Sequence, residues 1–383
     1  MRSILIELMH RDILLLALLA AIALALFLFT RDMAAKERAL DARIAAEWFD
    51  KGEQQARAGE QDKAIASFRK ATSIDHDNRM YLLALANALA AAGHRQEASQ
   101  VLLGLREVSP EDAEINLQLA RLAAKSGNED EAVRYYHNAF FGLWTGEKAD
   151  EERRNARVEL IRFLLNDHQS SKALPEVLAL AAEIPEDDEA GQAETGQLFL
   201  MAGDPQRALK HFARAIALNQ YNAEALAGAG QASFQLADYT AASRYLETAL
   251  AQGFNAEPER QLLAVAKLIQ TNDPLAPHLT REDRNRRLLA AFDQATLRLQ
   301  ACLDRRPGQE SSKSTSLESL KSDAVTMQAR LQPSNLRRDP EMLPAGMELI
   351  SKIEEATDAA CGEPAGLDRA LLLIGRKHRG ALQ

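Results

Sequence analysis

The sequence predicts an all-α protein built mainly as an α-solenoid, a row of helix pairs joined by turns. Three observations support this prediction. The apolar residues are largely Ala and Leu, and aromatic residues make up only 5% of the chain, a bias that favours helix. Apolar positions recur at helical spacing in runs that are separated by turns. One pattern of this kind returns six times at intervals close to 34 residues, which is the behaviour of a repeat protein.

Composition limits the classes of function. The chain has 383 residues, with 46 Lys plus Arg against 55 Asp plus Glu, so its formal net charge is −9. Hydrophobic residues make up 46% of the chain, which is enough for a core. The basic residues form no cluster interleaved with aromatic residues, as a nucleic-acid surface requires. We therefore expect no nucleic-acid partner.

The N-terminal segment contains 17 consecutive apolar residues, 13–29, between charged pairs at Arg11-Asp12 and Arg31-Asp32. At 1.5 Å per residue such a helix nearly crosses the hydrocarbon layer of a membrane. We expect residues 1–32 to be a cytoplasmic tail with a single-pass transmembrane anchor, followed by a helical connector over residues 33–44. A cleaved signal peptide and a buried core helix remain the alternatives.

The side of the membrane on which the large C-terminal part lies is predicted by two conflicting signals. Basic residues after the span, among them Arg31 and Lys36, favour the cytoplasm. Only two cysteines occur, Cys302 and Cys361, and an even pair without a C-x-x-C motif is typical of a disulfide in an oxidising compartment. Two buried free thiols are the alternative. We expect a bacterial inner-membrane protein with its soluble domain in the periplasm, and the cytoplasm as the alternative.

The repeats occupy residues 45–256, with copies near 45–78, 79–112, 113–146, 154–187, 189–222 and 223–256. Each copy contains two helices, and small residues are expected where the two approach closely, because no long side chain fits there. These repeat-packing residues are Gly52, Ala86, Ala120, Gly196 and Gly230 on the first helices, and Ala64, Ala98, Ala132, Ala208 and Ala242 on the second.

This pattern resembles the tetratricopeptide repeat, a 34-residue unit with small residues at its eighth and twentieth positions and a large residue at its twenty-fourth. Trp48, Pro110 and Pro185 also match the family pattern. The fourth copy departs from it, because Arg157 and His168 stand where a large apolar residue and Gly are usual. The resemblance implies an α-solenoid that binds a protein or peptide in a concave groove lined by the first helix of each repeat.

The family's groove positions predict the partner-binding residues of this chain. Arg121 and Lys125 lie four residues apart, so their charges share one helix face and suit an acidic segment. A solvated face with its own salt bridges is the alternative. The family's carboxylate clamp for chaperone tails is not expected, since Phe49, Glu53 and Leu117 occupy three of its five positions. The predicted groove residues are Asn87, Arg121, Lys125, Arg162, Asn166, Gln197, Gln231 and Phe234.

The C-terminal part is predicted to be a helical cap outside the repeats. Residues 257–304 form capping helices, which a solenoid needs to cover its exposed end. Residues 305–316 are polar and Ser-rich and are expected to be a flexible linker. Residues 317–383 form a further helical region, in which a disulfide would join Cys361 to Cys302.

The sequence offers no catalytic constellation. Eight histidines are scattered without metal-ligand spacing, and no nucleophile elbow or phosphate-loop motif occurs. We expect no enzyme, no cofactor, no metal and no small-molecule substrate. The favoured hypothesis is a membrane-anchored scaffold that binds a protein or peptide, as a holdase-like or assembly factor of a bacterial-type cell envelope. The alternative is a cytoplasm-facing adaptor that organises an envelope biosynthesis enzyme.

Overall fold

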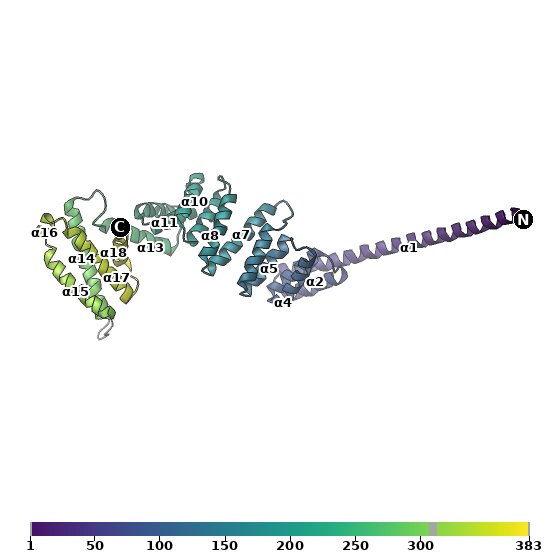
Figure 1. Ribbon diagram of the computed structural model, residues 1–383, viewed down its shortest axis with the longest axis horizontal. Helices are drawn as coiled ribbons and strands as arrows, with labels where there is room; N and C mark the ends of the chain where they lie inside the picture. Colours follow the sequence, from purple (N-terminus) through teal and green to yellow (C-terminus); the bar gives the residue numbers. More distant parts are fainter. Residues whose placement is uncertain (1, 306–311, 382–383) are drawn as a thin grey trace. The chain divides into compact units, whose positions relative to one another are not determined.

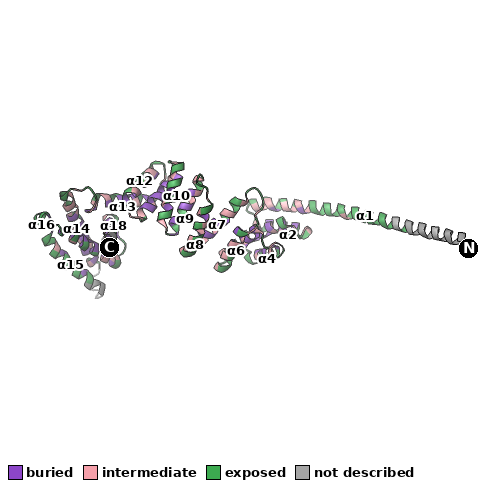
Figure 2. Ribbon diagram, turned by 45° about the horizontal axis from the view of Figure 1, so that its top comes forward, coloured by how far each residue is buried: buried purple, intermediate pink, exposed green. Residues whose placement is uncertain are grey.

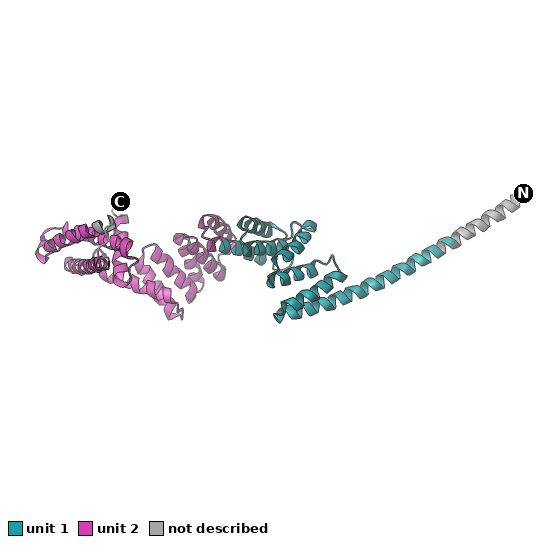
Figure 3. Cartoon of the chain, turned by 90° about the horizontal axis from the view of Figure 1, so that it is seen from below, with its two compact units in different colours: residues 1–163 teal, residues 164–383 magenta. Residues whose placement is uncertain are grey.

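The computed structural model describes the backbone of residues 2–305 and 312–381, and the side chains of residue 19 and of residues 22–305 and 316–379. Within these ranges the chain is helical, apart from turns, loops and an isolated bridge between Asp112 and Leu143, so the all-α prediction is confirmed (Figure 1). Two compact units are present, residues 1–163 and residues 164–383 (Figure 3).

The first unit consists of helix pairs that follow one another along the sequence. Its helices are α1 Arg2–Arg57, α2 Gln61–Ile74, α3 Arg79–Ala91, α4 Arg95–Val108, α5 Ala113–Lys125 and α6 Glu129–Phe141, and most of α7 Ala149–Asn166. The predicted fourth repeat was placed at residue 154, whereas α7 already begins at Ala149, because Asp150, Glu151 and Glu152 supply the acidic first turn that a helix N-terminus favours.

The second unit begins with the second helix of the fourth repeat, continues with two more pairs and ends with helices of a different arrangement. The second helix of the fourth repeat is α8 Ser170–Glu183. The two pairs and the helix that follows them are α9 Glu189–Met201, α10 Pro205–Leu218, α11 Ala223–Gln235, α12 Tyr239–Ala251 and α13 Glu257–Asn272. The remaining helices are α14 Arg281–Asp304, α15 Ser312–Arg330, α16 Pro333–Arg338, α17 Met342–Cys361 and α18 Gly366–Ala381.

Side-chain caps set where the first helix of a repeat begins. Asn78, Asp112, Asp188 and Asn222 each precede such a helix, and the side chain of each accepts a hydrogen bond from a backbone N–H in the first turn. These N–H groups have no partner within the helix, so an Asn or Asp cap stabilises the helix start by about 1 kcal/mol. The helices of four repeats therefore start at a locally encoded position.

A left-handed residue ends the first helix of every repeat. Gly93 has a φ of 88°, and the equivalent residues of the other repeats are also at positive φ. In the fourth and sixth repeats this position is held by His168, at 59°, and Ala237, at 58°. A side chain with a Cβ atom is strained in this conformation, by roughly 1–2 kcal/mol, whereas Gly is not.

The two helices of a repeat pack at the predicted small residues. Ala64, Ala98, Ala132, Ala208 and Ala242 are completely buried. A Cβ atom added to Gly52 would lie 2.6 Å from the Phe68 ring, and one added to Gly230 would lie 2.6 Å from Leu246 Cγ. The large residue of the second helix therefore fills the space that Gly leaves on the first.

Helix α1 runs without a break from Arg2 into the first repeat. Its described residues ahead of the repeat are exposed almost throughout (Figure 2). The predicted membrane segment, residues 13–29, lies partly outside the described residues, because the side chains of 13–18, 20 and 21 are not among them. A search of the described residues found no helix with the length and apolar character that a membrane span requires.

The C-terminal helices share one hydrophobic core with α13 and with Tyr239 of the sixth repeat. Phe292 of α14, Ile350 and Ile353 of α17 and Leu371 of α18 lie in this core. The predicted linker at residues 305–316 is shorter than expected, since α15 begins at Ser312. Its central part, residues 306–311, lies outside the described residues. The short helix α16 was not predicted, because only Leu336 among its residues is buried and six residues show no periodicity.

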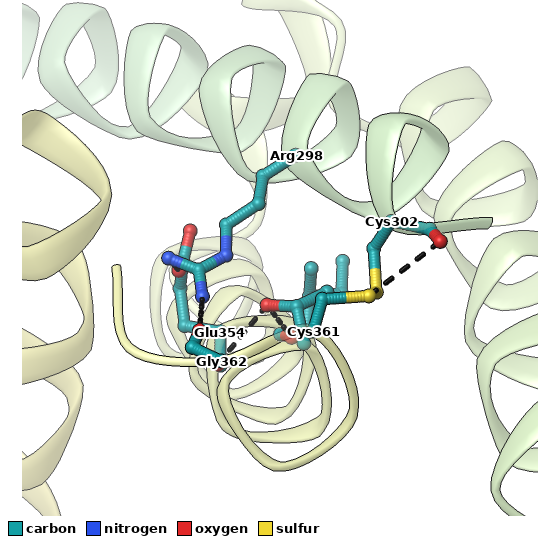
Figure 4. The surroundings of a disulfide bond; sticks show 7 residues. Arg298, Cys302, Glu354, Cys361 and Gly362 are labelled. Atoms are coloured by element: carbon teal, nitrogen blue, oxygen red, sulfur yellow. Dashed lines mark hydrogen bonds and ion pairs between the residues drawn. A yellow bond between two sulfur atoms is a disulfide. The ribbon is translucent and has the colours of Figure 1, made fainter. Parts of the chain in front are cut away.

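A disulfide and a buried ion pair join α14 to α17 side by side (Figure 4). Cys302 is bonded to Cys361, as the predicted pairing requires. One turn earlier on α14, Arg298 places Nη1 3.3 Å from a carboxylate oxygen of Glu354, a residue with 0% exposure. The same guanidinium donates through Nη2 to the Gly362 carbonyl, 3.2 Å away, directly after Cys361. The two helices are thus linked covalently and electrostatically within a few residues.

Glu354 is poorly compensated in this position. Within the described part of the chain, neither of its carboxylate oxygens has a hydrogen-bond partner, and Arg298 Nη1 has none either. Burial raises the pKa of Glu354 to about 8, although the charge of Arg298 opposes the shift. Transfer of a carboxylate out of water costs more than this single ion pair returns.

The strained turns predict a stabilising substitution. Ala237→Gly relieves the left-handed strain at the turn and should raise the free energy of unfolding by roughly 1 kcal/mol. Gly93→Ala introduces the same strain in the second repeat and should lower it by a similar amount. Urea denaturation of the full chain measures both changes. A decrease for Ala237→Gly would contradict the turn conformation, since that result is expected of Gly inside a regular helix.

The raised pKa of Glu354 predicts the pH dependence of stability. The unfolded carboxyl ionises near pH 4.5 and the folded one only near pH 8, so this group stabilises the fold below pH 4.5 and the stabilisation is lost as the pH rises towards 8. Relative to Glu354→Gln, the free energy of unfolding of the natural chain should therefore fall by on the order of 3 kcal/mol between pH 5 and 8. The free energy of unfolding is measured by denaturant titration at each pH. If it depends on pH in the same way for both proteins, the prediction is wrong and the Glu354 carboxylate is better compensated than its contacts indicate.

Candidate binding groove

A cavity of about 390 Å³ lies in the first unit, against the first helices of three repeats. Phe49 and Glu53 of α1 line one side of the cavity, and Met80, Leu83 and Asn87 of α3 line another. Met80 and Leu83 lie three residues apart and Leu83 and Asn87 four, so the three side chains share one helix face. Met80 is 54% exposed, which leaves its flexible thioether open to solvent at the cavity. The cavity therefore has a mixed apolar and polar lining and is accessible from outside.

The charged groups around this cavity are paired with one another. Arg79 donates from Nε to Asp112, at 2.6 Å, and from Nη2 to Glu114, at 2.9 Å. Burial of Asp112 opposes ionisation, but the hydrogen bonds from Arg79 and from the Ile115 N–H outweigh it and lower the pKa of this carboxyl. Glu53 forms an ion pair with Arg57 at 3.1 Å. The apolar side chains of Met80 and Leu83 and the amide of Asn87 are therefore the part of the lining that is available to a ligand.

Arg121, the central charge of the predicted groove, has an intramolecular partner. Its Nε and Nη2 atoms donate to the two carboxylate oxygens of Glu159 on α7, at 2.9 and 2.5 Å. These hydrogen bonds raise the pKa of the Arg121 guanidinium, so it stays charged. Tyr136 lies beside the pair, and burial raises its pKa to about 12. At Arg121 the structure therefore agrees with the alternative prediction, a solvated helix face whose charges form salt bridges within the chain.

The other predicted groove residues of the first unit differ from Arg121. Asn87 is exposed and lines the cavity, and it has no hydrogen-bond partner among the described residues. Lys125, in the last turn of α5, is exposed and forms no ion pair within the described part of the chain. Arg162 is exposed on α7. Asn87 is thus the one of these side chains that the structure brings into the cavity.

In the second unit the predicted groove residues fall into two groups. Asn166 and Gln197 are exposed. Gln231 donates a hydrogen bond to the buried Glu259 of α13, and Phe234 packs edge-on against Tyr239, with ring centroids 5.2 Å apart. Phe234 also contacts the C-terminal core. Gln231 and Phe234 therefore help to join the last repeat to the helices that follow it.

Several residues of the cavity were not among the predicted ones. Met80, Leu83 and Glu114 line it, although only Asn87 was named in advance. Leu83 could have been found from its helical spacing to Asn87. Met80 lies in the first turn of α3. The preceding residue, Arg79, donates hydrogen bonds to Asp112, the N-cap of α5, and to Glu114 in α5, which are 33 and 35 residues further along the chain. Contacts at that separation follow from the packing of repeats and not from local spacing.

No group of three or more His, Cys, Asp or Glu side chains that could hold a metal ion occurs in the described part of the chain. Two histidines, His378 and His211, form hydrogen bonds within the fold. His378 lies 3.1 Å from both carboxylate oxygens of the buried Asp273, and His211 lies 2.8 Å from Gln192. Burial lowers the pKa of His211, which favours its neutral form.

Comparison of the sequence with protein families matches residues 199–268 to the tetratricopeptide repeat. The matched segment covers the end of α9, the whole of α10 to α12 and most of α13. The left-handed turn of these pairs recurs in the other repeats. The predicted repeat family is therefore supported, while the membrane-anchored bacterial type is not tested by this match.

A curated relative is anaphase-promoting complex subunit 6 of Dictyostelium discoideum, 28% identical over 104 residues, which are 27% of this chain. The match spans only 12% of that protein's length.

Solved structures with similar folds include YrrB, described as a tetratricopeptide repeat protein with an unusual peptide-binding site, at 20% identity and a TM-score of 0.40. The alignment covers 52% of this chain and 97% of YrrB. PilW, a type IV pilus biogenesis factor, is 17% identical with a TM-score of 0.41, over 57% of this chain and 98% of PilW. A tetratricopeptide repeat protein of Parabacteroides merdae is 15% identical with a TM-score of 0.42, over 74% of this chain and 99% of that protein.

Proposed function

We propose that this protein is a single-pass membrane-anchored scaffold whose tetratricopeptide repeats bind a segment of another protein, as an assembly or holdase-like factor of a bacterial-type cell envelope. The observation that carries the proposal is the open cavity on the first helices of the first three repeats. A flexible Met, the buried Leu83 and an Asn with no hydrogen-bond partner among the described residues line it. A binding role fits this surface because its charges are already paired and its free groups are those that suit a peptide.

The anchor is supported by the sequence and by the course of α1. Residues 13–29 are apolar without interruption, and α1 carries them in the same helix as the first repeat. Among the described side chains of that segment, Leu26, Phe27, Leu28 and Phe29 are each more than half exposed. Apolar side chains on all sides of a helix favour a lipid environment over water.

The periplasmic side is favoured by the disulfide between Cys302 and Cys361, because such bonds persist in oxidising compartments. The cytoplasm-facing adaptor is the second candidate, and the basic residues Arg31, Lys36, Arg38 and Arg43 after the apolar segment favour it. The location of the two cysteines relative to the membrane distinguishes the two candidates.

The binding proposal predicts site-specific crosslinking. With a photoreactive amino acid at Met80 in the full chain, irradiated cells should yield adducts of higher mass that contain a second polypeptide. Asn87→Asp should reduce the yield several-fold, because it adds negative charge to a cavity that Glu53 and Glu114 already line. Adducts are measured by gel shift and mass spectrometry.

Leu103 provides the matched control for this experiment. It is an exposed apolar residue, 39% accessible, on α4, the second helix of the same repeat, and it does not line the cavity. The same photoreactive residue at Leu103 should give few adducts. Equal yields at the two positions, or no polypeptide adduct at Met80, would refute the groove as the binding surface.

The topology is tested by labelling the two cysteines with a membrane-impermeant maleimide in intact cells. Labelling that requires a reductant but not lysis would place the disulfide outside the cytoplasm. Labelling that requires lysis but no reductant would place free thiols in the cytoplasm and favour the adaptor. Cys302→Ser with Cys361→Ser gives the background signal in both cases.

A further inference from the structure

A second cavity, of about 530 Å³, lies in the C-terminal region between the start of α14 and α16. Arg281 and Arg286 of α14 and Arg337 of α16 line it, together with Glu282 and Asn285. Three guanidinium groups therefore share one cavity with a single carboxylate. This excess of positive charge stands out in a chain whose net charge is −9.

The neighbouring acidic residues balance only part of that charge, because the three guanidinium groups face two carboxylates, Glu282 in the lining and Asp283 beside it. Asp283 forms an ion pair with Arg286 at 2.5 Å and also accepts a hydrogen bond from the Thr280 hydroxyl. Neither Arg281 nor Arg337 has a carboxylate within ion-pair distance in the described ranges. Like charges held close together destabilise one another, so a bound anion would stabilise this arrangement.

The positions of these arginines are set by the surrounding fold. Leu336 is buried in the C-terminal core and holds α16 in place beside α14. Arg281 donates from Nη1 to the Arg337 carbonyl, 3.3 Å away, which brings the two residues together although they are 56 positions apart. Thr280 caps α14 by accepting from the Asp283 N–H. The cavity is thus built on ordered helices rather than on a loop.

The lining also contains apolar groups. Leu289 of α14 and Pro333 and Leu336 of α16 form the part of the cavity that carries no charge. A ligand that matches the whole lining needs a compact anionic group, which the unpaired Arg281 and Arg337 can bind, joined to an apolar body. The planar guanidinium group binds phosphate oxygens through paired hydrogen bonds, and a phosphomonoester or diphosphate carries the required charge.

We propose that this cavity binds the phosphate group of a phosphomonoester or diphosphate, with the apolar part of the ligand against Leu289 and Leu336. Arg281 and Arg337 donate to the phosphate oxygens, Arg286 adds charge at the rim, and Asn285 supplies an amide. A soluble metabolite and the headgroup of an anionic lipid share this chemistry. The site is independent of the proposed groove, because it lies in the C-terminal region and uses none of the groove residues.

The experiment titrates the full chain, solubilised in dodecyl maltoside, with inorganic pyrophosphate and with dihexanoyl phosphatidic acid, and measures binding by calorimetry. Dihexanoyl phosphatidylcholine is the lipid control that lacks a net charge. We expect saturable binding of at least one anionic probe and none of the neutral lipid. Binding of pyrophosphate alone would identify a soluble ligand, binding of phosphatidic acid alone a lipid headgroup, and binding of both a site specific for the phosphate group itself.

Variants assign the binding to the cavity. Arg281→Gln with Arg337→Gln should weaken binding at least about tenfold, since each removes a charge-assisted hydrogen bond. Arg338→Gln removes the same charge from the next residue of α16, which does not line the cavity, and should leave the affinity unchanged. If the double variant loses its helical circular dichroism, Arg286→Gln replaces it. Absence of binding to both anionic probes, or equal weakening by Arg338→Gln, would overturn the proposal.

Discussion

The close approach of the two helices in each repeat is the constraint on which the other features of the array depend. It requires Gly or Ala on both helices where they meet, and a large side chain such as Phe68 or Leu246 occupies the remaining space. Once the helices are so close, the connection must turn sharply, and a left-handed residue at each turn provides this. The groove-facing side of each first helix is then determined, because the opposite side is buried.

The arginines of the groove carry little free positive charge, because carboxylates within the chain already bind them. Arg79 and Arg121 are both bound by carboxylates of the following repeat. Such pairs contribute little to stability when half-exposed, but they neutralise the groove locally and hold its charged side chains in defined positions. In the proposed groove, the uncharged residues Met80, Leu83 and Asn87 are therefore the ones available to a partner, and the paired charges lie around them. A basic residue at a groove position is therefore not sufficient evidence of an anion-binding groove.

The C-terminal region differs from the repeats in how it is held together. Its helices are joined by a disulfide, by the buried Arg298–Glu354 pair and by one hydrophobic core, and not by a repeated local contact. This arrangement places charged residues where no repeat pattern requires them. Glu354 is buried at a cost in stability, and the arginines around α16 carry charge that nearby carboxylates do not balance.

The sequence by itself determined the helical class, the period of the repeats, the small residues at which the helices meet and, if a disulfide forms, which two cysteines it joins. These features are local or periodic, so they follow from helix spacing, from caps such as Asp112 and from an exclusive choice of partner when only two cysteines exist. Only the tertiary structure decided that Glu159 binds Arg121, that Phe234 belongs to the C-terminal core, and that Arg281 and Arg337 share a cavity. Those contacts join residues that are tens of positions apart, and many partners of equal charge or apolarity were available at such distances. Packing selects one of them, because only one brings the atoms within hydrogen-bonding or van der Waals range.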